Sequence, residues 1–223
     1  MSWRDWVRGS EIEPSLYAAD FGRLGEQVDL LLRAGVRIFH FDVGDGHFVE
    51  PVTIGPIVLR SIAERVHEGG AVLDCHLMVA NPARHIPQIA GAGGDSVTFH
   101  HEVTDDVEGL VALAREHGLG AGLAFNPETP VAEAARAADG GDLVLCMSIH
   151  PGYSGQAFLA ESLGRIRELR RLLPGHMHVQ VDGGIDEGNV RAVREAGANL
   201  VVAGSAVFGA ADIASAYRQL ASA

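Results

Sequence analysis

The sequence predicts an α/β fold, specifically a (β/α)8 barrel made by a single domain, from three observations. Eight short β-rich runs alternate with amphipathic stretches along the 223 residues. Hydrophobic residues make up 47% of the chain and charged residues 21%, which is enough for one full core. Polar, reactive side chains lie at the ends of several of these runs. The active site of a parallel barrel is assembled at the C-terminal ends of its strands. A doubly wound open sheet would give the same alternation but rarely carries reactive groups on so many strand ends.

The strands are predicted where β-branched and other apolar residues form short runs. In chain order they are residues 11–17, 36–43, 71–79, 95–101, 120–126, 142–149, 176–184 and 199–204. No low-complexity segment or interdomain linker interrupts them. We therefore expect residues 1–223 to form one barrel domain, in which residues 1–10 are an N-terminal extension.

Helices are predicted where apolar residues recur at helical spacing between the strands. They are residues 21–35, 57–69, 106–118, 158–175, 189–197 and 212–221. Asp20 is the expected N-cap of the first helix, and Gly35 is expected to end it.

Composition excludes several classes of function. The net charge of −12 argues against a nucleic-acid partner, since phosphate backbones bind clustered basic residues. No apolar run reaches the roughly 20 residues of a membrane span, and the start lacks a signal-peptide pattern, so we expect a cytoplasmic protein. Cys75 and Cys146 lie in apolar runs and are read as reduced, buried thiols. All 17 basic residues are Arg, which excludes Schiff-base chemistry, a Walker-type loop and a lysine base.

Strand alternation predicts a cluster of metal-ligating side chains inside the barrel. Residues two apart on a strand share a face, so His40 and Asp42 point the same way. His76 on the third strand and Asp182 on the seventh have the same inward orientation, if Phe39, Phe41, Val179 and Val181 pack against helices. Two imidazoles and two carboxylates suit one divalent transition ion, with Zn²⁺ first and Fe²⁺, Mn²⁺ or Co²⁺ also possible. Asp74 is expected to orient these ligands from beneath His76.

Glycine-rich turns follow the last three strands. They are residues 151–155 after the sixth strand, 182–184 at the end of the seventh, and 203–205 at the end of the eighth. Barrels often bind phosphate at the loops after strands seven and eight through backbone N–H groups. Because the chain has no lysine, backbone amides and the Ser205 hydroxyl are the groups left to hold a phosphate.

Eight stretches together resemble the ribulose-phosphate 3-epimerase family. They are EPSLYAADF, HFDVGDGHFVEPVTIGP, LDCHLMV, VTFHHE, NPETP, MSIHPGYSGQAF, VDGGI and VAGSAVF, in order from about residue 12 to 208. The resemblance implies a metal-dependent TIM barrel that inverts C3 of a ketose phosphate, interconverting D-ribulose 5-phosphate and D-xylulose 5-phosphate. Such an isomerase uses two bases and an enediolate. The expected partner is a small-molecule sugar phosphate, and we expect a homo-oligomer.

The resemblance also assigns roles residue by residue. It implies metal ligation by His40, Asp42, His76 and Asp182, with Asp42 and Asp182 as the catalytic acid and base. The residues that match the family's substrate contacts are Ser15, His76, Gly152, Tyr153, Ser154, Gly155, Asp182, Gly183, Gly184, Gly204 and Ser205.

Three departures from the family pattern lie near the expected substrate. Gly44 replaces a methionine, Glu50 lies in a changed FVEP segment, and His150 begins a changed HPGYSGQ segment. If Gly44 leaves free volume, the substrate could be a longer hexulose or heptulose phosphate. Related barrel decarboxylases and hexulose-phosphate synthases depend on a lysine, which is absent. A non-catalytic sugar-phosphate-binding protein is a more distant alternative, because it would be expected to have lost a base.

Overall fold

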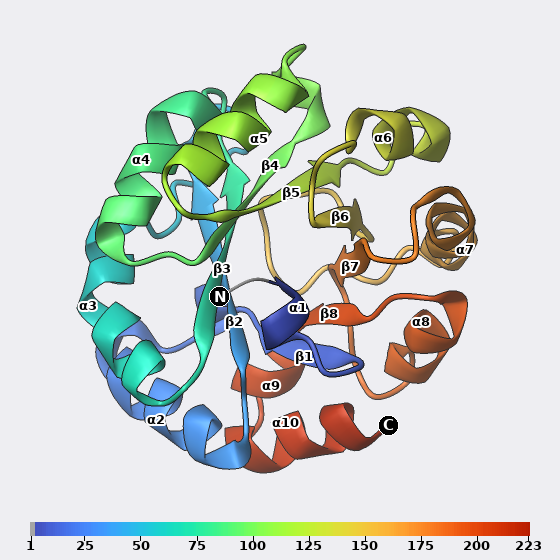
Figure 1. Ribbon diagram of the computed structural model, residues 1–223. Helices are drawn as coiled ribbons and strands as arrows, with labels where there is room; N and C mark the ends of the chain where they lie inside the picture. The colour runs from blue at the N-terminus through green and yellow to red at the C-terminus, as the bar shows by residue number, and fades with distance from the viewer. Residues whose placement is uncertain (1–2) are drawn as a thin grey trace.

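Eight parallel strands form the centre of the computed structural model, which describes residues 3–223. They are β1 (Glu11–Pro14), β2 (Ile38–Gly44), β3 (Val72–Met78), β4 (Ser96–His100), β5 (Gly120–Phe125), β6 (Leu143–Met147), β7 (His178–Asp182) and β8 (Leu200–Ala203). Consecutive strands pair from β2 to β8, and β8 pairs with β1. A parallel bridge between Ser15 and His40 joins β1 to β2. The predicted (β/α)8 TIM barrel is therefore confirmed (Figure 1).

Helices surround the strands (Figure 1). They are α2 (Leu24–Ala34), α3 (Pro56–Glu68), α4 (Pro82–Ala92), α5 (Val107–Glu116), α6 (Val131–Ala137), α7 (Ser162–Leu172), α8 (Val190–Ala196), α9 (Ser205–Phe208) and α10 (Ile213–Ser222). Over residues 3–223, no helix has both the length and the apolar character required to cross a bilayer.

Every predicted strand is present in the structure, but the first predicted helix begins later in the sequence than predicted. The Asp20 side chain accepts a hydrogen bond from the Gly22 amide and caps a short 3-10 turn, η2 (Phe21–Arg23). The α-helix itself begins afterwards, at Leu24. Gly35 ends it in the left-handed region with φ 101°, as predicted.

Three of these helices, α4, α6 and the four-residue α9, were not predicted. Pro82 and Pro87 in α4 suggest a break, yet Pro82 occupies the first turn, where its missing N–H has no partner to lose. Asn81 caps this helix by accepting from the Arg84 amide. Helix α6 has the sequence VAEAARA, in which Val131 is the only large apolar residue, so its helical period is weak.

The strand faces divide the interior as alternation predicts. Phe39, Phe41, Val179 and Val181 are fully buried in the apolar cluster that includes helix residues, so they face outward from the barrel. A second apolar cluster contains residues at the beginnings of strands, including Ile38, Val72, Leu143 and Leu200, together with Trp3 and Trp6. The polar side chains Asp42, His76 and Asp182 lie farther along β2, β3 and β7, toward the ends of these strands.

The predicted N-terminal extension contains a short helix, α1 (Trp3–Trp6), while residues 1–2 lie outside the described residues. This helix lies at the end of the barrel where the strands begin (Figure 1). The Trp3 ring lies 5.2 Å from Trp6 and 5.9 Å from His178, between ring centroids. The extension thus covers one end of the barrel.

Removing Trp3 should therefore destabilise the barrel. Trp3 is 2% exposed, and truncating a buried aromatic side chain to Ala usually costs about 3–5 kcal/mol. We expect a loss on this scale for Trp3→Ala in the free energy of unfolding, measured by urea denaturation. Arg167→Ala is the control, since Arg167 is exposed on α7. Equal stability of the two variants would contradict the packing role of α1.

Candidate active site

The four predicted metal ligands meet at the ends of three strands. His40 and Asp42 share the inner face of β2, and His76 on β3 is in register with Asp42. Asp182 is the last residue of β7. His40 and His76 are fully buried, Asp42 is 4% exposed, and the Asp182 side chain is 18% exposed. The cluster therefore lies beneath the open end of the barrel.

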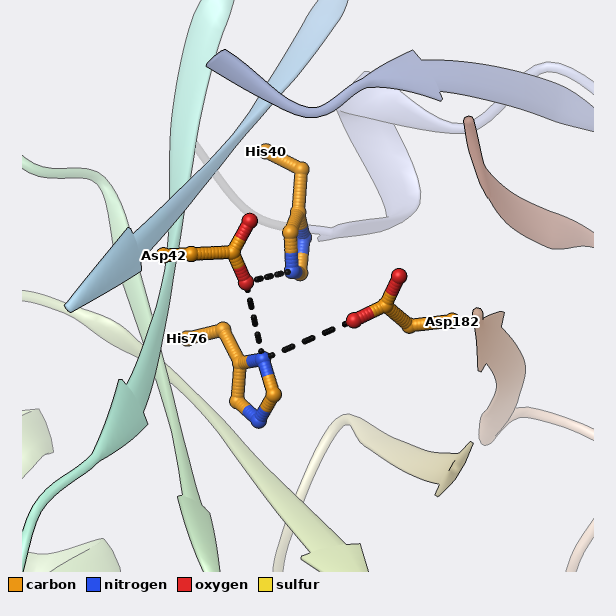
Figure 2. A group of neighbouring side chains, drawn as sticks. All are labelled: His40, Asp42, His76 and Asp182. Carbon is orange, nitrogen blue, oxygen red and sulfur yellow. Dashed lines mark hydrogen bonds and ion pairs between the residues drawn. The ribbon is translucent and has the colours of Figure 1, made fainter. Parts of the chain in front are cut away.

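Asp42 holds the two imidazoles together, as Figure 2 shows. Its Oδ1 atom lies 3.1 Å from His76 Nδ1 and 3.3 Å from His40 Nε2. Asp182 Oδ2 lies 3.8 Å from the same Nδ1 atom of His76. One nitrogen or oxygen from each of the four residues lies within 4.8 Å of all the others.

The donor atoms fit a divalent metal ion. The set of two imidazole nitrogens and two carboxylates is typical of transition-metal sites. His40 Nε2 is buried and has no hydrogen-bond partner, which is uncommon for a polar atom inside a protein. A cation among these four residues would use its lone pair. The cluster can hold a metal ion.

A buried polar network supports His40 from below. Asp74 Oδ2 lies 3.2 Å from His40 Nδ1 and accepts from Gln180 Nε2 at 2.7 Å, while Asp74 Oδ1 accepts from Ser96 Oγ at 2.6 Å. Gln180 Nε2 also donates to Glu13 Oε2 at 2.5 Å. Asp74 was expected beneath His76, but the strand register places it against His40 instead.

The two carboxylates of the cluster differ in proton affinity. Burial and the adjacent Asp42 raise the pKa of Asp182 to about 7. Burial also disfavours the charge of Asp42, but His40 and His76 outweigh it and hold the Asp42 pKa well below its ordinary range. Paired carboxyl groups whose pKa values are pushed apart are typical of acid–base sites. Asp42 therefore carries negative charge at neutral pH, while Asp182 can gain or lose a proton.

A pocket opens directly above this cluster. It is lined by Ser15, Tyr17, Asp42, Met78, Met147, Ile149, Pro151, Gly152, Tyr153, Ser154, Gly155, Asp182, Gly183, Gly184, Ile185, Val202, Gly204 and Ser205. All the residues that match substrate contacts are among them except His76, which lies in the cluster below. Met78 and Met147 give the pocket an apolar side.

Ser15 connects the pocket to the cluster. Its hydroxyl donates to Asp42 Oδ2 at 2.6 Å, so the serine fixes the carboxylate oxygen that does not face the histidines. Ser15 itself is buried, with 7% of its surface exposed. The sequence-based role of Ser15 was a substrate contact, and the structure adds this bond to Asp42.

Close packing requires glycine at the far side of the pocket. Gly183 has φ 121° and Gly184 has φ 65°, a region that other residues rarely adopt. A Cβ at Gly184 would lie 2.4 Å from the backbone nitrogen of Phe158, and one at Gly183 would lie 2.3 Å from Ile149. Both glycines line the pocket with main-chain atoms alone.

Three polar residues near the site were not singled out from the sequence. Glu13, His100 and Glu102 are connected to the cluster through His40 or His76. Burial raises the pKa of Glu13 to about 7, whereas burial lowers the pKa of His100 to about 4. Strand alternation could have indicated Glu13, since it lies two residues before Ser15.

Comparison with known proteins identifies the family. Residues 11–208 match the model described as the Ribulose-phosphate 3 epimerase family. The chain belongs to this family. Ribulose-phosphate 3-epimerase of Escherichia coli (strain K12) is 42% identical over 200 residues, covering 88% of each chain. The enzyme of that name from Schizosaccharomyces pombe is 41% identical over 199 residues, covering 89% of this chain and 87% of its own.

Solved structures of other barrel enzymes share the fold. 3-Hexulose-6-phosphate synthase from Salmonella typhimurium aligns with a TM-score of 0.73 at 18% identity, covering 95% of this chain and 97% of its own. Orotidine 5′-phosphate decarboxylase from Pyrococcus horikoshii aligns with a TM-score of 0.69, also at 18% identity, covering 94% and 96%. At such low identity these likenesses show the fold alone.

Gly44, one of the three departures from the family pattern described above, does not leave free volume. A Cβ there would lie 3.0 Å from the Pro51 carbonyl oxygen and 3.0 Å from side-chain carbons of Val49 and Thr53. Thr53 Oγ1 accepts from the Gly44 amide at 2.6 Å and donates to the Asp42 carbonyl at 2.8 Å. The condition set for a longer substrate, free volume at Gly44, is not met, because residues 49–53 fold back over the end of β2.

Glu50 and His150 likewise do not line the pocket. Glu50 is hydrogen-bonded to Tyr153, and His150 Nε2 lies 2.5 Å from Glu128 Oε1. Both side chains are therefore engaged with neighbouring loops at the surface.

A methionine at position 44 should be hard to accommodate in this chain. Overpacking a filled site typically costs about 1–3 kcal/mol, and we expect Gly44→Met to lose this much in the free energy of unfolding. Urea denaturation measures it. The matched control is Gly164→Ala in α7, where a Cβ meets nothing within 4 Å. Unchanged stability of Gly44→Met would show that residues 49–53 move aside readily.

Proposed function

We propose that this protein is an isomerase that inverts C3 of D-ribulose 5-phosphate to give D-xylulose 5-phosphate, and the reverse. One observation carries the proposal: Asp42 and Asp182 come from separate strands, β2 and β7, and both line one pocket above two histidines. Inversion requires proton transfer on two faces of one carbon. Identity of 42% to the E. coli enzyme of this name supports the same reaction.

The proton at C3 lies next to a ketone and is only weakly acidic, so its removal requires stabilisation of negative charge. We propose one divalent ion held by His40, Asp42, His76 and Asp182, which would act as a Lewis acid toward the ketone oxygen. Zn²⁺ fits the four donors, and Fe²⁺, Mn²⁺ or Co²⁺ would fit as well.

The two carboxylates divide the proton transfers. In one direction of the reaction, Asp42 takes the proton from one face of C3 and Asp182 delivers a proton to the opposite face, since both carboxyl groups line the pocket. The roles exchange in the reverse reaction. Ser15 limits rotation of Asp42 by its hydrogen bond to Oδ2.

The phosphate group lies at the glycine-rich side of the pocket in this proposal. Backbone amides of Gly183, Gly184 and Gly204 and the hydroxyl groups of Ser154 and Ser205 are available at the pocket wall. Charge neutralisation by lysine is impossible in this chain. Binding through main-chain N–H groups is the common solution in such barrels.

No specific observation now favours a longer ketose phosphate as the substrate. Its basis was the space at Gly44, which Val49, Pro51 and Thr53 occupy. A non-catalytic binding role is disfavoured because both carboxylates are present and their pKa values are separated. We also propose a cytoplasmic homo-oligomer, for which the exposed apolar side chains of Val52 and Ile57 offer a contact surface.

The direct test is an epimerisation assay in D₂O. Ribulose 5-phosphate should be converted to xylulose 5-phosphate carrying deuterium at C3, because the removed proton exchanges with solvent. C6 and C7 ketose phosphates, assayed in parallel, should react with much lower kcat/KM. A preference for a C6 or C7 substrate would reverse this assignment.

The proposed metal site predicts the metal content of the purified protein. We expect about one divalent ion per chain by elemental analysis, and loss of most of it in His40→Ala and His76→Ala, since four residues hold the ion jointly. His47→Ala is the control, because His47 is exposed and lies outside the cluster. Full metal content in both ligand variants would place the ion elsewhere.

Each carboxylate should be essential for turnover. A positioned acid or base usually contributes about 10²–10⁴-fold, so Asp42→Asn and Asp182→Asn should each lower kcat by at least this factor. Asp139→Asn, at an exposed position, should leave kcat unchanged. Measuring the residual metal content of each variant separates lost proton transfer from lost metal. A kcat within tenfold of wild type in either variant would contradict two-base catalysis.

A further inference from the structure

The motif VTFHHE, residues 97–102, places two polar residues beside His76 that do not line the pocket. His100 ends β4 and is fully buried, and Glu102 follows in the 3-10 turn η3 (His101–Val103). Neither touches the pocket where the reaction is proposed. A buried histidine bonded to a carboxylate therefore needs another role.

His76 and Glu102 are connected through His100. His76 Nε2 lies 2.8 Å from His100 Nε2, and His100 Nδ1 lies 3.2 Å from Glu102 Oε2. The two rings are inclined by only 26°, with centroids 5.0 Å apart, so they meet edge to edge. Figure 2 shows that the second nitrogen of the His76 ring points away from the carboxylates of the cluster.

Two carboxylates lie at the ends of this chain: Glu102 beyond His100, and Asp42, whose Oδ1 lies 3.1 Å from His76 Nδ1. A cation bound by the four proposed ligands would face His76 Nδ1 on the Asp42 side, so Glu102 is the acceptor that sets the proton positions. An ionised carboxylate can only accept, so His100 Nδ1 donates to Glu102. Only one hydrogen fits between the two Nε2 atoms. If His100 is neutral, its Nε2 accepts, and the hydrogen belongs to His76 Nε2. The Nδ1 atom of His76 is then unprotonated and presents its lone pair to the cluster.

We propose that Glu102 and His100 are positioning residues that hold His76 in the tautomer required for metal ligation. The inference rests on the proposed metal site. The carboxylate of Asp74 contacts the His40 ring directly and fixes its tautomer. The carboxylate of Glu102 acts on His76 through a second imidazole, that of His100. Hydrogen bonding of a ligand histidine to a carboxylate is a recurrent way to fix its tautomer.

Glu102 is itself held in a fixed orientation. Its Oε1 atom accepts from the Asn126 amide at 2.7 Å and from the Thr129 hydroxyl. Oε2 is thereby directed at His100, and Phe48 covers the His100 ring at 4.6 Å between centroids. The carboxylate cannot turn away from His100 without breaking the two bonds to β5–α6 residues.

This geometry makes Glu102→Gln a sharp test. The amide oxygen can keep both bonds to Asn126 and Thr129, which leaves the NH₂ group facing His100 Nδ1. His100 Nδ1 must then accept, so its Nε2 donates and His76 becomes protonated on Nδ1. The loop between β5 and α6 therefore stays bonded to residue 102, while the tautomer of His76 is reversed.

Nitrogen NMR of the Zn²⁺-loaded protein and a Co²⁺ titration of the metal-depleted protein check this. Nitrogen NMR of ¹⁵N-histidine-labelled protein should show His76 protonated on Nε2 in wild type and on Nδ1 in Glu102→Gln, its signals identified by their loss in His76→Ala. Competition with a chelating dye should show a Co²⁺ affinity about 10–100-fold weaker in Glu102→Gln, the usual effect of losing such a partner.

Thr129→Val is the matched control, because it removes a bond to Glu102 without altering the group that faces His100. It should keep wild-type tautomer and Co²⁺ affinity. An unchanged His76 tautomer in Glu102→Gln, or a Co²⁺ affinity within twofold of wild type, would each overturn the proposal. Wild-type protein that epimerises ribulose 5-phosphate but shows His76 protonated on Nδ1 would also overturn it while leaving the proposed function intact.

Discussion

The contact between Asp42 and two imidazoles is the interaction on which the site depends. Adjacent parallel strands put Asp42 opposite His76, and alternation puts His40 on the same face two residues earlier. All three side chains are removed from water, where an isolated carboxylate would be strongly disfavoured. Their mutual contacts compensate, and they also create a group of lone pairs in a confined space. The sheet register is thus what turns four separate residues into one site.

The remaining buried polar groups extend this arrangement in two directions. Asp74, Gln180 and Glu13 lie on one side, toward the starts of the strands, and His100 and Glu102 lie on another, toward β4. Each direction ends at a carboxylate that constrains one histidine. Partly satisfied buried networks are costly, and this one has unpaired atoms at His40 Nε2, where a cation would lie, and deeper at Glu13 Oε1 and Gln180 Oε1.

Much of the barrel and its cluster could be predicted because strand alternation is a strict local rule. Inward His40, Asp42, His76 and Asp182 and outward Phe39 and Phe41 follow from it. The failures involve contacts that strand alternation does not specify. Nothing local to Gly44 reveals that Pro51 and Thr53 return to cover it. Similarly, Asp74 serves His40 rather than His76 because of the register between β2 and β3. Helix α4 was missed because the usual effect of Pro87 is overridden by burial of Ile86 and Ile89 on its inner face.

The position of α1 has a practical consequence for spectroscopy. The chain has two tryptophans, Trp3 and Trp6, and both belong to this helix. They lie with the residues that begin the strands, whereas the pocket lies where the strands end. Intrinsic tryptophan emission therefore monitors only the end of the barrel opposite the pocket. A change in this emission during a titration with sugar phosphate would be evidence that the two ends of the barrel are coupled, rather than of direct contact with the bound molecule.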